Sequence, residues 1–366
     1  MIQFLDLKKI TALHYDELHE ALARTLRSGW FLKGEETATF ERLYAQFTGT
    51  SHCVGCGNGL DALTLIMRAY IELGVMKPGD EVIVPANTYI ASVLAVSRNN
   101  LKPVLVEADI DTLQMDDSKI EEAITPRTKA IMIVHLYGKC AYTDTIGRLC
   151  KHYGLKLIED NAQAHGCRYA GRRTGSLGDA AAHSFYPTKN IGTAGDAGAV
   201  TTDDAVLAEM VRGLANYGSA KKYIFSHIGI NSRMDELHAA ILTVKLKYID
   251  AENEQRRDNA RYYINNVSNR NIKLPSLEYW ESSVFHIFPI LCDRRDELKD
   301  YLLRNGVQTD VHYPVPPHKQ ECYKELAALS FPVTERIHRE ELSIPVSQIL
   351  EPEERETIAR LLNQFR

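Results

Sequence analysis

With 366 residues, the chain is longer than one hydrophobic core usually serves, so the sequence predicts two domains. A hydrophobic content of 45% and a charged content of 25% are ordinary for a globular protein. The net charge of −5 and the lack of any block of Lys or Arg argue against nucleic acid or an anionic membrane as a partner.

The first residues and the cysteines bear on where the protein is found. The opening stretch, MIQFLDLKK, has no basic segment followed by an apolar core, which argues against a signal peptide, and no apolar run approaches a membrane span. Seven cysteines at irregular spacing favour reduced thiols and a cytoplasmic protein. Cys53 and Cys56 form a single CxxC pair, so no metal site is expected and a redox role is only a weak alternative.

Two amphipathic helices are predicted before residue 50. One covers Tyr15–Arg27, and the second carries an aromatic face and ends at Gly49. The glycine-rich segment GCGNGLD, at residues 55–61, then opens an apolar helix that closes at Gly74. Glycines before a helix leave free backbone N–H groups at the positive end of its dipole, so this loop is a candidate phosphate site. A tight loop whose glycines serve only backbone geometry is an equal alternative.

Strands and helices alternate between residues 81 and 158. The predicted strands are Glu81–Pro85, Pro103–Ala108, Ala130–Leu136 and Leu155–Ile158, and the predicted helices are Asp117–Ile124 and Asp144–Tyr153. This alternation indicates an α/β fold with a mostly parallel sheet and helices on both faces. Ligands bind at the carboxyl ends of strands in such sheets, and Tyr89 follows the first of these strands, where it could stack on a ring.

An acid and a lysine stand out within this pattern. The strand ending at Ile158 leads into Glu159-Asp160-Asn161-Ala162-Gln163, and the run HSFYPTKNIGTAGDAGAV at residues 183–200 contains Lys189. A lone lysine is usually a surface charge, and an acid after a strand is often a cap. Together they match the needs of pyridoxal phosphate (PLP), which forms a Schiff base with a lysine amine and needs a carboxylate to keep its pyridine nitrogen protonated.

The remaining chain is predicted to hold a smaller α+β domain. A long helix is expected from about Asp235, and its face changes from apolar to charged beyond Asp250, which suits a helix that bridges two domains. We therefore expect a large domain at residues 1–245 and a smaller one at residues 246–366. The other elements predicted after Lys189 are the strands Gly198–Thr202, Phe285–Leu291 and Val307–His312, and the helices Ala205–Arg212, Arg294–Asn305 and Glu353–Phe365.

Six motifs in combination resemble one known family. They are NGLDAL (58–63), PANTYIAS (85–92), EDNAQAHG (159–166), SFYPTKNIG (184–192), GDAGAV (195–200) and NSRMDELHAA (231–240). They resemble the DegT/DnrJ/StrS family of PLP-dependent nucleotide-sugar aminotransferases, and the similarity runs almost end to end. The resemblance implies the aspartate-aminotransferase-like (type I) PLP fold and a homodimer.

The resemblance also implies roles at a cofactor site. Lys189 would hold PLP as a Schiff base and then move a proton between substrate and cofactor, a task worth roughly 10²–10⁴ in rate. Asp160 would pair with the pyridinium nitrogen. The other implied contacts are Gln163 with the ring hydroxyl, Tyr89 stacked on the ring, the backbone of Gly59 and Leu60 and the hydroxyl of Ser184 with the phosphate, and Asn231 with the phosphate of the other subunit.

Within the family, the segments NYGS followed by KKY and the segment VHYPVPPH resemble enzymes that aminate C3 of dTDP-3-keto-6-deoxyhexoses. The amino donor implied is L-glutamate. By this analogy, the sugar-nucleotide site would be lined by Tyr186, Tyr217, Lys222, Tyr223, His312, Tyr313 and His318. Lys222 could meet the diphosphate as a point charge. For His312, Tyr313 and His318, a surface loop stiffened by prolines is the structural alternative.

Four alternative functions share parts of this sequence pattern. A 4-keto sugar aminotransferase stays open. In PLP-dependent sugar dehydratases of the same fold a histidine typically replaces the Schiff-base lysine, so Lys189 argues against that activity. A non-catalytic PLP- or nucleotide-sugar-binding regulator would not need the amine. A nicotinamide oxidoreductase would rest on the glycine loop, where G-x-G-x-x-G fails from Gly55 and only a looser form fits from Gly57.

Overall fold

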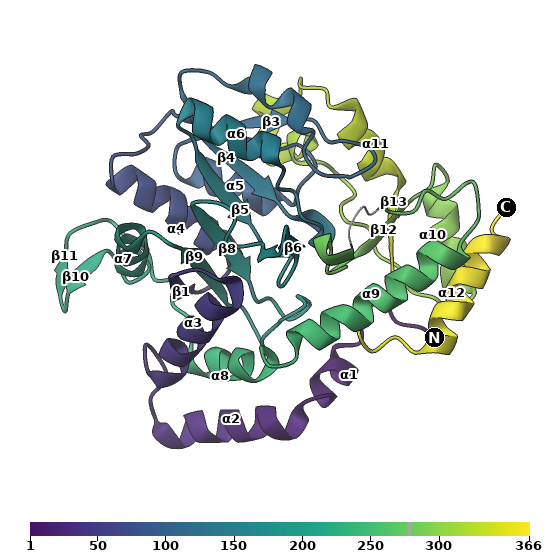
Figure 1. Ribbon diagram of the computed structural model, residues 1–366, viewed down its shortest axis with the longest axis horizontal. Coiled ribbons are helices and arrows are strands. Elements are labelled where there is room, and N and C mark those ends of the chain that lie inside the picture. The colour runs from purple at the N-terminus through teal and green to yellow at the C-terminus, as the bar shows by residue number, and fades with distance from the viewer. Residues whose placement is uncertain (277–279) are drawn as a thin grey trace.

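A seven-stranded sheet forms the centre of the molecule, in the order β1-β9-β8-β5-β4-β2-β3. The computed structural model describes residues 1–276 and 280–366 (Figure 1). Adjacent strands from β3 to β8 are parallel, whereas β9 runs antiparallel to both of its neighbours. The expected mostly parallel α/β sheet is therefore confirmed. Its strands are β1 (His52–Cys56), β2 (Glu81–Pro85), β3 (Lys102–Val106), β4 (Thr128–Val134), β5 (Lys156–Asp160), β8 (Ala180–Ser184) and β9 (Gly198–Thr202).

Both faces of this sheet are covered by helices. Successive side chains of a strand point to opposite faces, and in β4 Ala130 and Met132 pack into a core with α4, α5 and α7, whereas Ile131 and Ile133 pack with α6. Near the other edge, α3 and α8 cover β1 and β9. The helices are α1 (Leu7–Ala12), α2 (Tyr15–Ser28), α3 (Glu35–Thr48), α4 (Gly59–Glu72), α5 (Ile90–Arg98), α6 (Asp144–Tyr153), α7 (Ala205–Leu214), α8 (Glu236–Lys245), α9 (Ile249–Asn266), α10 (Arg295–Arg304), α11 (Pro332–Glu340) and α12 (Pro352–Gln364).

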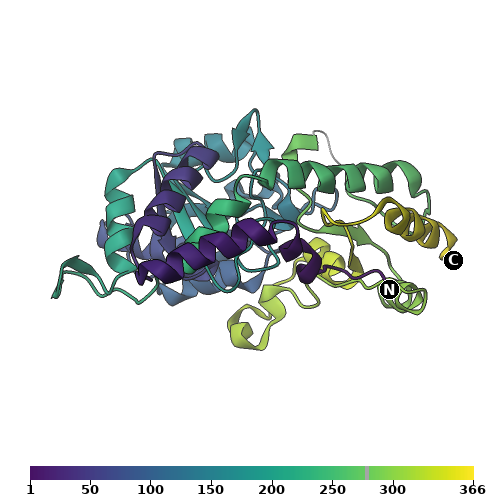
Figure 2. The ribbon, with the colours of Figure 1, turned by 90° about the horizontal axis from the view of Figure 1, so that it is seen from below.

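A second hydrophobic core lies at the C-terminal end of the molecule (Figure 2). It joins α9, α10 and α12 to a ribbon of β12 (Phe288–Leu291) and β13 (Glu341–Ile344), and Ile2 from the start of the chain packs against it. A separate core is what a smaller C-terminal domain requires. The boundary at residue 245 stays a prediction. Among the described residues, no helix has the length and apolarity needed to cross a bilayer.

The single long helix predicted from Asp235 is wrong, because α8 ends at Lys245 and α9 begins at Ile249. The chain between them is held by tertiary contacts. Tyr248 stacks on His14 with ring centroids 3.8 Å apart, and the Lys245 ammonium donates to the Gly192 carbonyl at 2.6 Å. These contacts keep α8 against the sheet layer, while α9 runs on toward the second core (Figure 1).

Two other predicted elements are wrong. In place of a helix at Asp117–Ile124, the chain makes two short 3-10 turns, because the Asp116 side chain caps the first and Pro126 prevents a helix from continuing. The expected strand Val307–His312 is reduced to isolated bridges at Val307 and Asp310. The strands β1 and β8 and the helices α5 and α11 were not predicted.

Candidate active site

Asp160 is the last residue of β5 and marks the centre of the candidate site. Its carboxylate accepts hydrogen bonds from the Ser92 hydroxyl at 2.8 Å and from the Ala162 amide at 3.2 Å. Burial raises the pKa of Asp160, and the Ser92 bond, the Ala162 bond and the charge of Lys189 oppose that rise. A cationic partner placed beside a buried carboxyl group stabilises its ionised form. A protonated pyridine nitrogen fits that requirement.

Lys189 lies in the turn that follows β8, where its backbone N–H donates to the Tyr186 carbonyl at 2.8 Å. Burial lowers the pKa of its amine to about 8, and the negative charge of Asp160 acts in the opposite direction. An amine with such a pKa is partly neutral near neutral pH, as a nucleophile or general base must be. The chemistry of the donor set at Lys189 and Asp160 therefore fits PLP.

Gln163 joins three loops of the site. Its amide oxygen accepts from the Tyr137 N–H at 2.6 Å, and its amide nitrogen donates to the Tyr313 hydroxyl at 3.0 Å. The Tyr313 ring packs against Tyr89 with centroids 4.9 Å apart and an angle of 38° between the planes. Tyr89 is still half exposed, so a face of its ring remains available for stacking. The structure thus brings together Gln163, Tyr89 and Tyr313.

The N-terminus of α4 forms the candidate phosphate cradle. Asn58 caps the helix by accepting from the Asp61 amide at 2.8 Å, which leaves the first amides, those of Gly59 and Leu60, without an intrahelical acceptor. A Cβ atom on Gly59 would stand 2.7 Å from the Cβ of Ser184, so only glycine lets the helix end approach the end of β8 this closely. Backbone donors, a serine hydroxyl and a helix dipole suit a phosphate.

His312 lies on the C-terminal side of the site. Its carbonyl accepts from the Tyr137 hydroxyl at 2.7 Å, and its Nδ1 is 2.8 Å from the Ser343 hydroxyl. Burial lowers the pKa of His312 to about 4, and the nearby charge of Lys189 adds to that effect while Asp310 opposes it. The imidazole is therefore neutral at physiological pH.

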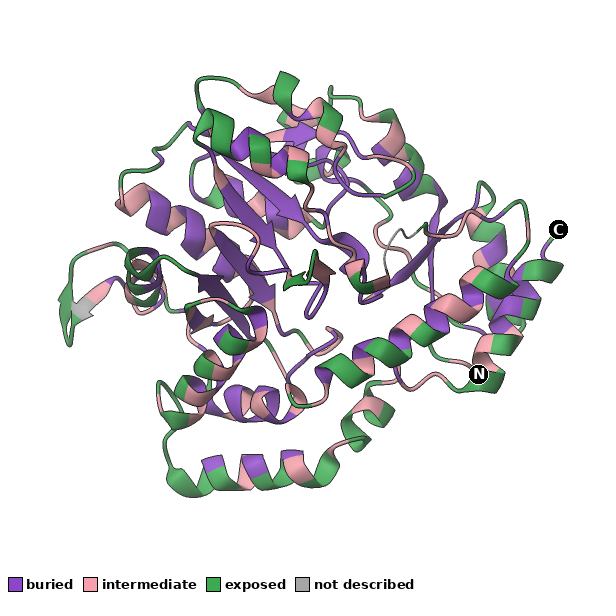
Figure 3. Cartoon of the chain, viewed as in Figure 1, coloured by how far each residue is buried: buried purple, intermediate pink, exposed green. Residues whose placement is uncertain are grey.

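Several predicted substrate residues do not join this group within one chain. Tyr217, Lys222 and Tyr223 lie on or beside the hairpin of β10 (Ser219–Lys221) and β11 (Ile224–Phe225), which projects from the body and is exposed (Figures 1 and 3). Asn231 is exposed and bridges to Asn216 at the base of that hairpin. In the described part of the chain, no hydrogen bond, ion pair or ring contact links these four residues to Lys189 or Asp160.

The last two predicted substrate residues differ in exposure. Tyr186 is half exposed in the turn that holds Lys189, so its ring is free to meet a ligand. His318 is fully buried, lies 3.0 Å from the Glu335 carboxylate and packs edge-on against Phe331. Its surroundings favour a packing role, and its place at the substrate site stays a prediction.

Sequence reasoning missed the residues that hold these side chains. Ser92, which donates to Asp160, stands three residues after Tyr89 on the first turn of α5, so the signal was its place in the PANTYIAS motif. Tyr137 follows β4 at the ligand-binding edge of the sheet, a position that could have identified it. Ser343 carries no such signal, because it reaches the site from β13 of the second core.

The CxxC pair is not a redox site. Cys53 and Cys56 are buried in different cores on opposite faces of β1. Burial raises the pKa of both thiols above the ordinary value, which suppresses the reactive thiolate. All seven cysteines of the chain lie in the described residues and are unpaired.

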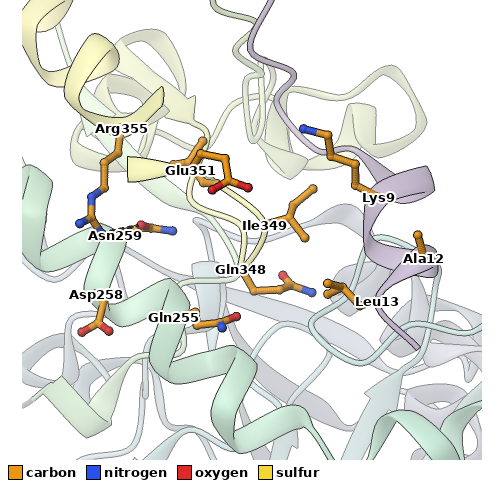
Figure 4. A pocket seen from close by; sticks show the side chains of 11 residues that line it. Lys9, Ala12, Leu13, Gln255, Asp258, Asn259, Gln348, Ile349, Glu351 and Arg355 are labelled. Atoms are coloured by element: carbon orange, nitrogen blue, oxygen red, sulfur yellow. Dashed lines mark hydrogen bonds between the residues drawn. The ribbon is translucent and has the colours of Figure 1, made fainter. Parts of the chain in front are cut away.

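A cavity of about 610 Å³ does not have Lys189 in its walls (Figure 4). Its walls come from α1, α9, the segment before α12 and Arg355 of α12, and they share no residue with the group around Asp160. Side-chain chemistry, and not cavity size, therefore marks the candidate active site.

The model of the DegT/DnrJ/EryC1/StrS aminotransferase family matches residues 14–363. The chain belongs to this family. A dTDP-3-amino-3,6-dideoxy-alpha-D-galactopyranose transaminase from Aneurinibacillus thermoaerophilus is 51% identical over 365 residues, which are 100% of this chain and 99% of the relative. The DegT-family assignment makes the chain a PLP-dependent aminotransferase and confirms the predicted cofactor and fold.

Two solved structures agree with this assignment. DesV from S. venezuelae, solved in complex with a ketimine intermediate, has a TM-score of 0.95 and 43% identity, with 99% of this chain and 98% of that chain covered. Ntda from Bacillus subtilis, solved with bound cofactor PMP, has a TM-score of 0.90 and 34% identity, with 98% and 83% covered. Because the chain belongs to a family of PLP-dependent aminotransferases, the nicotinamide oxidoreductase alternative is wrong.

Proposed function

We propose that this DegT-family enzyme transfers an amino group from L-glutamate to a dTDP-linked 3-keto-6-deoxyhexose, giving a dTDP-3-amino-3,6-dideoxyhexose. The observation that carries the proposal is the 51% identity, over the whole chain, to a relative named for such a product. The candidate site supports it with an amine at Lys189 that is partly neutral near pH 8. A location in the cytoplasm, where the seven unpaired thiols would stay reduced, belongs to the same proposal.

In this proposal the chain's own residues divide the work. Bound PLP supplies an aldehyde for the amine and a ring that accepts electrons. Asp160 stabilises positive charge at the ring nitrogen, and Lys189 moves the proton at the reacting carbon. Gln163 and Tyr89 orient the ring, and the N-terminal amides of Gly59 and Leu60 bind the phosphate together with Ser184.

The substrate site is completed by a second copy of the chain. In one subunit, Tyr186 and His312 stand near Lys189, and Tyr313 stands near Asp160. The exposed hairpin with Lys222 and Tyr223 would come from the other subunit, together with Tyr217 and Asn231. Tyr223, Ile224, Phe225 and Ile228 are between 57% and 84% exposed, an apolar area that a subunit interface would bury. This exposed apolar area supports the proposal of a homodimer with shared sites.

Absorbance of the purified protein tests the first half of the proposal. Added PLP should give a visible band, and L-glutamate should bleach it while 2-oxoglutarate is formed. Lys189→Ala should abolish the lysine-dependent band, whereas Lys247→Ala, at an exposed pair with Glu17, should leave it unchanged. A band that L-glutamate does not alter would contradict the donor, and a protein that gives no band would contradict the cofactor site.

The second half of the proposal concerns the sugar. The glutamate-treated enzyme should convert a dTDP-3-keto-6-deoxyhexose to the 3-amino sugar, identified by NMR of the product. Amination of a dTDP-4-keto-6-deoxyhexose at C4 in preference would overturn the 3-keto choice and favour the 4-keto alternative.

A further inference from the structure

Glu341 is a fully buried acid behind His312. One carboxyl oxygen accepts from the backbone N–H of His312 at 2.6 Å, and the other contacts the Ser343 hydroxyl. The same hydroxyl lies 2.8 Å from Nδ1 of His312. Glu341, Ser343 and His312 therefore form one unbroken hydrogen-bonded chain that starts on β13, on the strand face opposite the second core, and ends at the candidate active site.

This chain permits two arrangements of protons. If Glu341 is protonated, its O–H donates to Ser343, the Ser343 hydroxyl donates to Nδ1, and the proton of the neutral imidazole is on Nε2. If Glu341 is ionised, Ser343 donates to the carboxylate, Nδ1–H donates to Ser343, and Nε2 has a lone pair. A carboxyl group that reaches the ring through one intervening residue, Ser343, thus determines which imidazole nitrogen carries the proton.

We propose that protonated Glu341 is a positioning residue that holds His312 in the Nε2–H tautomer through Ser343, so that His312 donates a hydrogen bond to an oxygen of the sugar substrate. This inference rests on the proposed function, in which His312 lines the sugar site. Loss of the Glu341 proton reverses the chain and removes the donor.

The surrounding charges agree with this direction. Burial raises the pKa of Glu341 to about 8 despite its hydrogen bonds and the nearby Arg295, so the acid is protonated at neutral pH. Asp310 lies 3.9 Å from Nε2 and also favours a proton there. The other titratable groups that face Glu341 or His312 are Tyr137, Tyr313, Lys189 and His286.

Glutamine at position 341 mimics the protonated acid. Its oxygen can accept from the His312 N–H and its NH₂ can donate to Ser343, so Glu341→Gln should fix the Nε2–H tautomer at every pH. The matched control is Glu340→Gln, because the neighbouring Glu340 pairs with Arg336 on α11 and does not contact His312.

The experiment compares the two half-reactions of the holoenzyme between pH 6.5 and 9.5. In the wild type, the keto-sugar half-reaction should slow by about tenfold per pH unit above the Glu341 pKa, because the donor form is lost. Glu341→Gln should be within about twofold of wild type at pH 7 and lose this dependence. Titration of Lys189 would affect both proteins alike, and the glutamate half-reaction should be the same in both.

NMR of protein labelled with ¹⁵N in histidine gives a direct second measurement. The ¹⁵N signals of His312 are assigned by their loss in His312→Asn. Between pH 7 and 10, in the wild type and in Glu340→Gln, the Nε2 shift should change from that of a protonated to that of an unprotonated nitrogen, and the Nδ1 shift should change in the opposite direction. In Glu341→Gln both shifts should stay unchanged. Shifts that are the same in wild type and Glu341→Gln across this range would overturn the inference. A failed glutamate half-reaction in the wild type would instead count against the proposed function.

Discussion

At the scale of single residues, the buried hydrogen-bond network around Glu159 is expected to contribute to stability. Glu159 is fully buried and accepts from the amides of Gly175, Leu177 and Gly178 at 2.7–2.8 Å. It also accepts from Nε2 of His135, which must be the protonated nitrogen because Nδ1 accepts from the Ala141 amide. Glu159→Gln leaves some of these donors unpaired and should lower the free energy of unfolding by about 2–4 kcal/mol.

The loss of unfolding free energy in Glu159→Gln should be largest at neutral pH and smallest in acid. Burial acts to raise the pKa of Glu159, but His135 and the amides outweigh it and hold the pKa below its ordinary value. A lowered folded-state pKa stabilises the fold above the unfolded pKa of about 4.3, and the gain is lost as the pH falls through the folded value. Urea unfolding curves of wild type and Glu159→Gln should thus differ most at pH 7 and converge below pH 4. The exposed Glu297→Gln serves as the control, and equal curves at pH 7 would contradict the prediction.

A second residue-scale prediction concerns the amine of Lys189. Burial moves its pKa down to about 8, and only the neutral amine attacks an aldehyde. The rate of reconstitution with PLP should therefore rise about tenfold per pH unit below 8 and level off above it, as followed by stopped-flow absorbance. Asp160→Asn removes the opposing negative charge and should move the midpoint to lower pH. A wild-type midpoint near 10 would show that the amine is solvated like a surface lysine.

How much of the site could be predicted depends on where each contact comes from. Asp160, Gln163 and Tyr89 follow strands of one sheet, so strand order alone brings them to one edge. Ser343 and Glu341 approach from the second core, across a distance in sequence that no local pattern encodes. For the residues of the β10–β11 hairpin, the sequence motif is recognisable, but the fold of a single chain leaves them exposed and does not bring them to Lys189.

At the scale of elements, the approach of α4 to β8 carries a prediction. Gly59→Ala would place a Cβ 2.7 Å from Ser184 and separate the helix end from the strand, so PLP affinity should fall by at least tenfold in absorbance titrations. Gly213→Ala is the matched control. Gly213 lies within α7, and a Cβ atom there would be 3.6 Å from its nearest neighbour, the Ser219 carbonyl oxygen, which is an ordinary contact distance. That control should bind PLP normally and gain about 0.5–1 kcal/mol in stability. Equal PLP affinity in the two variants would contradict the cradle.

Some elements carry local signals at both ends that allow their prediction, whereas others depend on tertiary contacts. The prediction for α6 agrees with the structure because Thr143 caps its start and Gly154 ends it in a left-handed conformation. By contrast, β8 reads Ala-Ala-Ala-His-Ser, a sequence with little strand preference that becomes a strand because β5 and β9 pair with it on both sides. The break between α8 and α9 has no Gly or Pro to announce it.

At the scale of the whole molecule, the separation between Lys189 and the β10–β11 hairpin predicts that activity requires two chains. If each site takes Lys189 from one subunit and Asn231 from the other, Lys189→Ala and Asn231→Asp homodimers should both be impaired, the second because a carboxylate would repel the phosphate. In a hybrid of the two, one of the two sites has both wild-type residues. Subunits mixed one to one after denaturation and refolding should thus recover about a quarter of wild-type activity.

The activity recovered on mixing shows which subunit supplies Asn231 to a site, because sites built from one chain alone would give a different result. If Asn231 served its own subunit, every site in the mixture would lack one of the two residues, and mixing would restore nothing. Light scattering should show a dimer for both variants, and replacing Ile224 and Phe225 by serine should shift the wild-type protein toward monomer, because burial of these exposed side chains is the gain expected at the interface. Since no single chain unites the hairpin with Lys189, the dimer would be the smallest active unit, and activity per chain should fall on dilution as the monomer fraction rises.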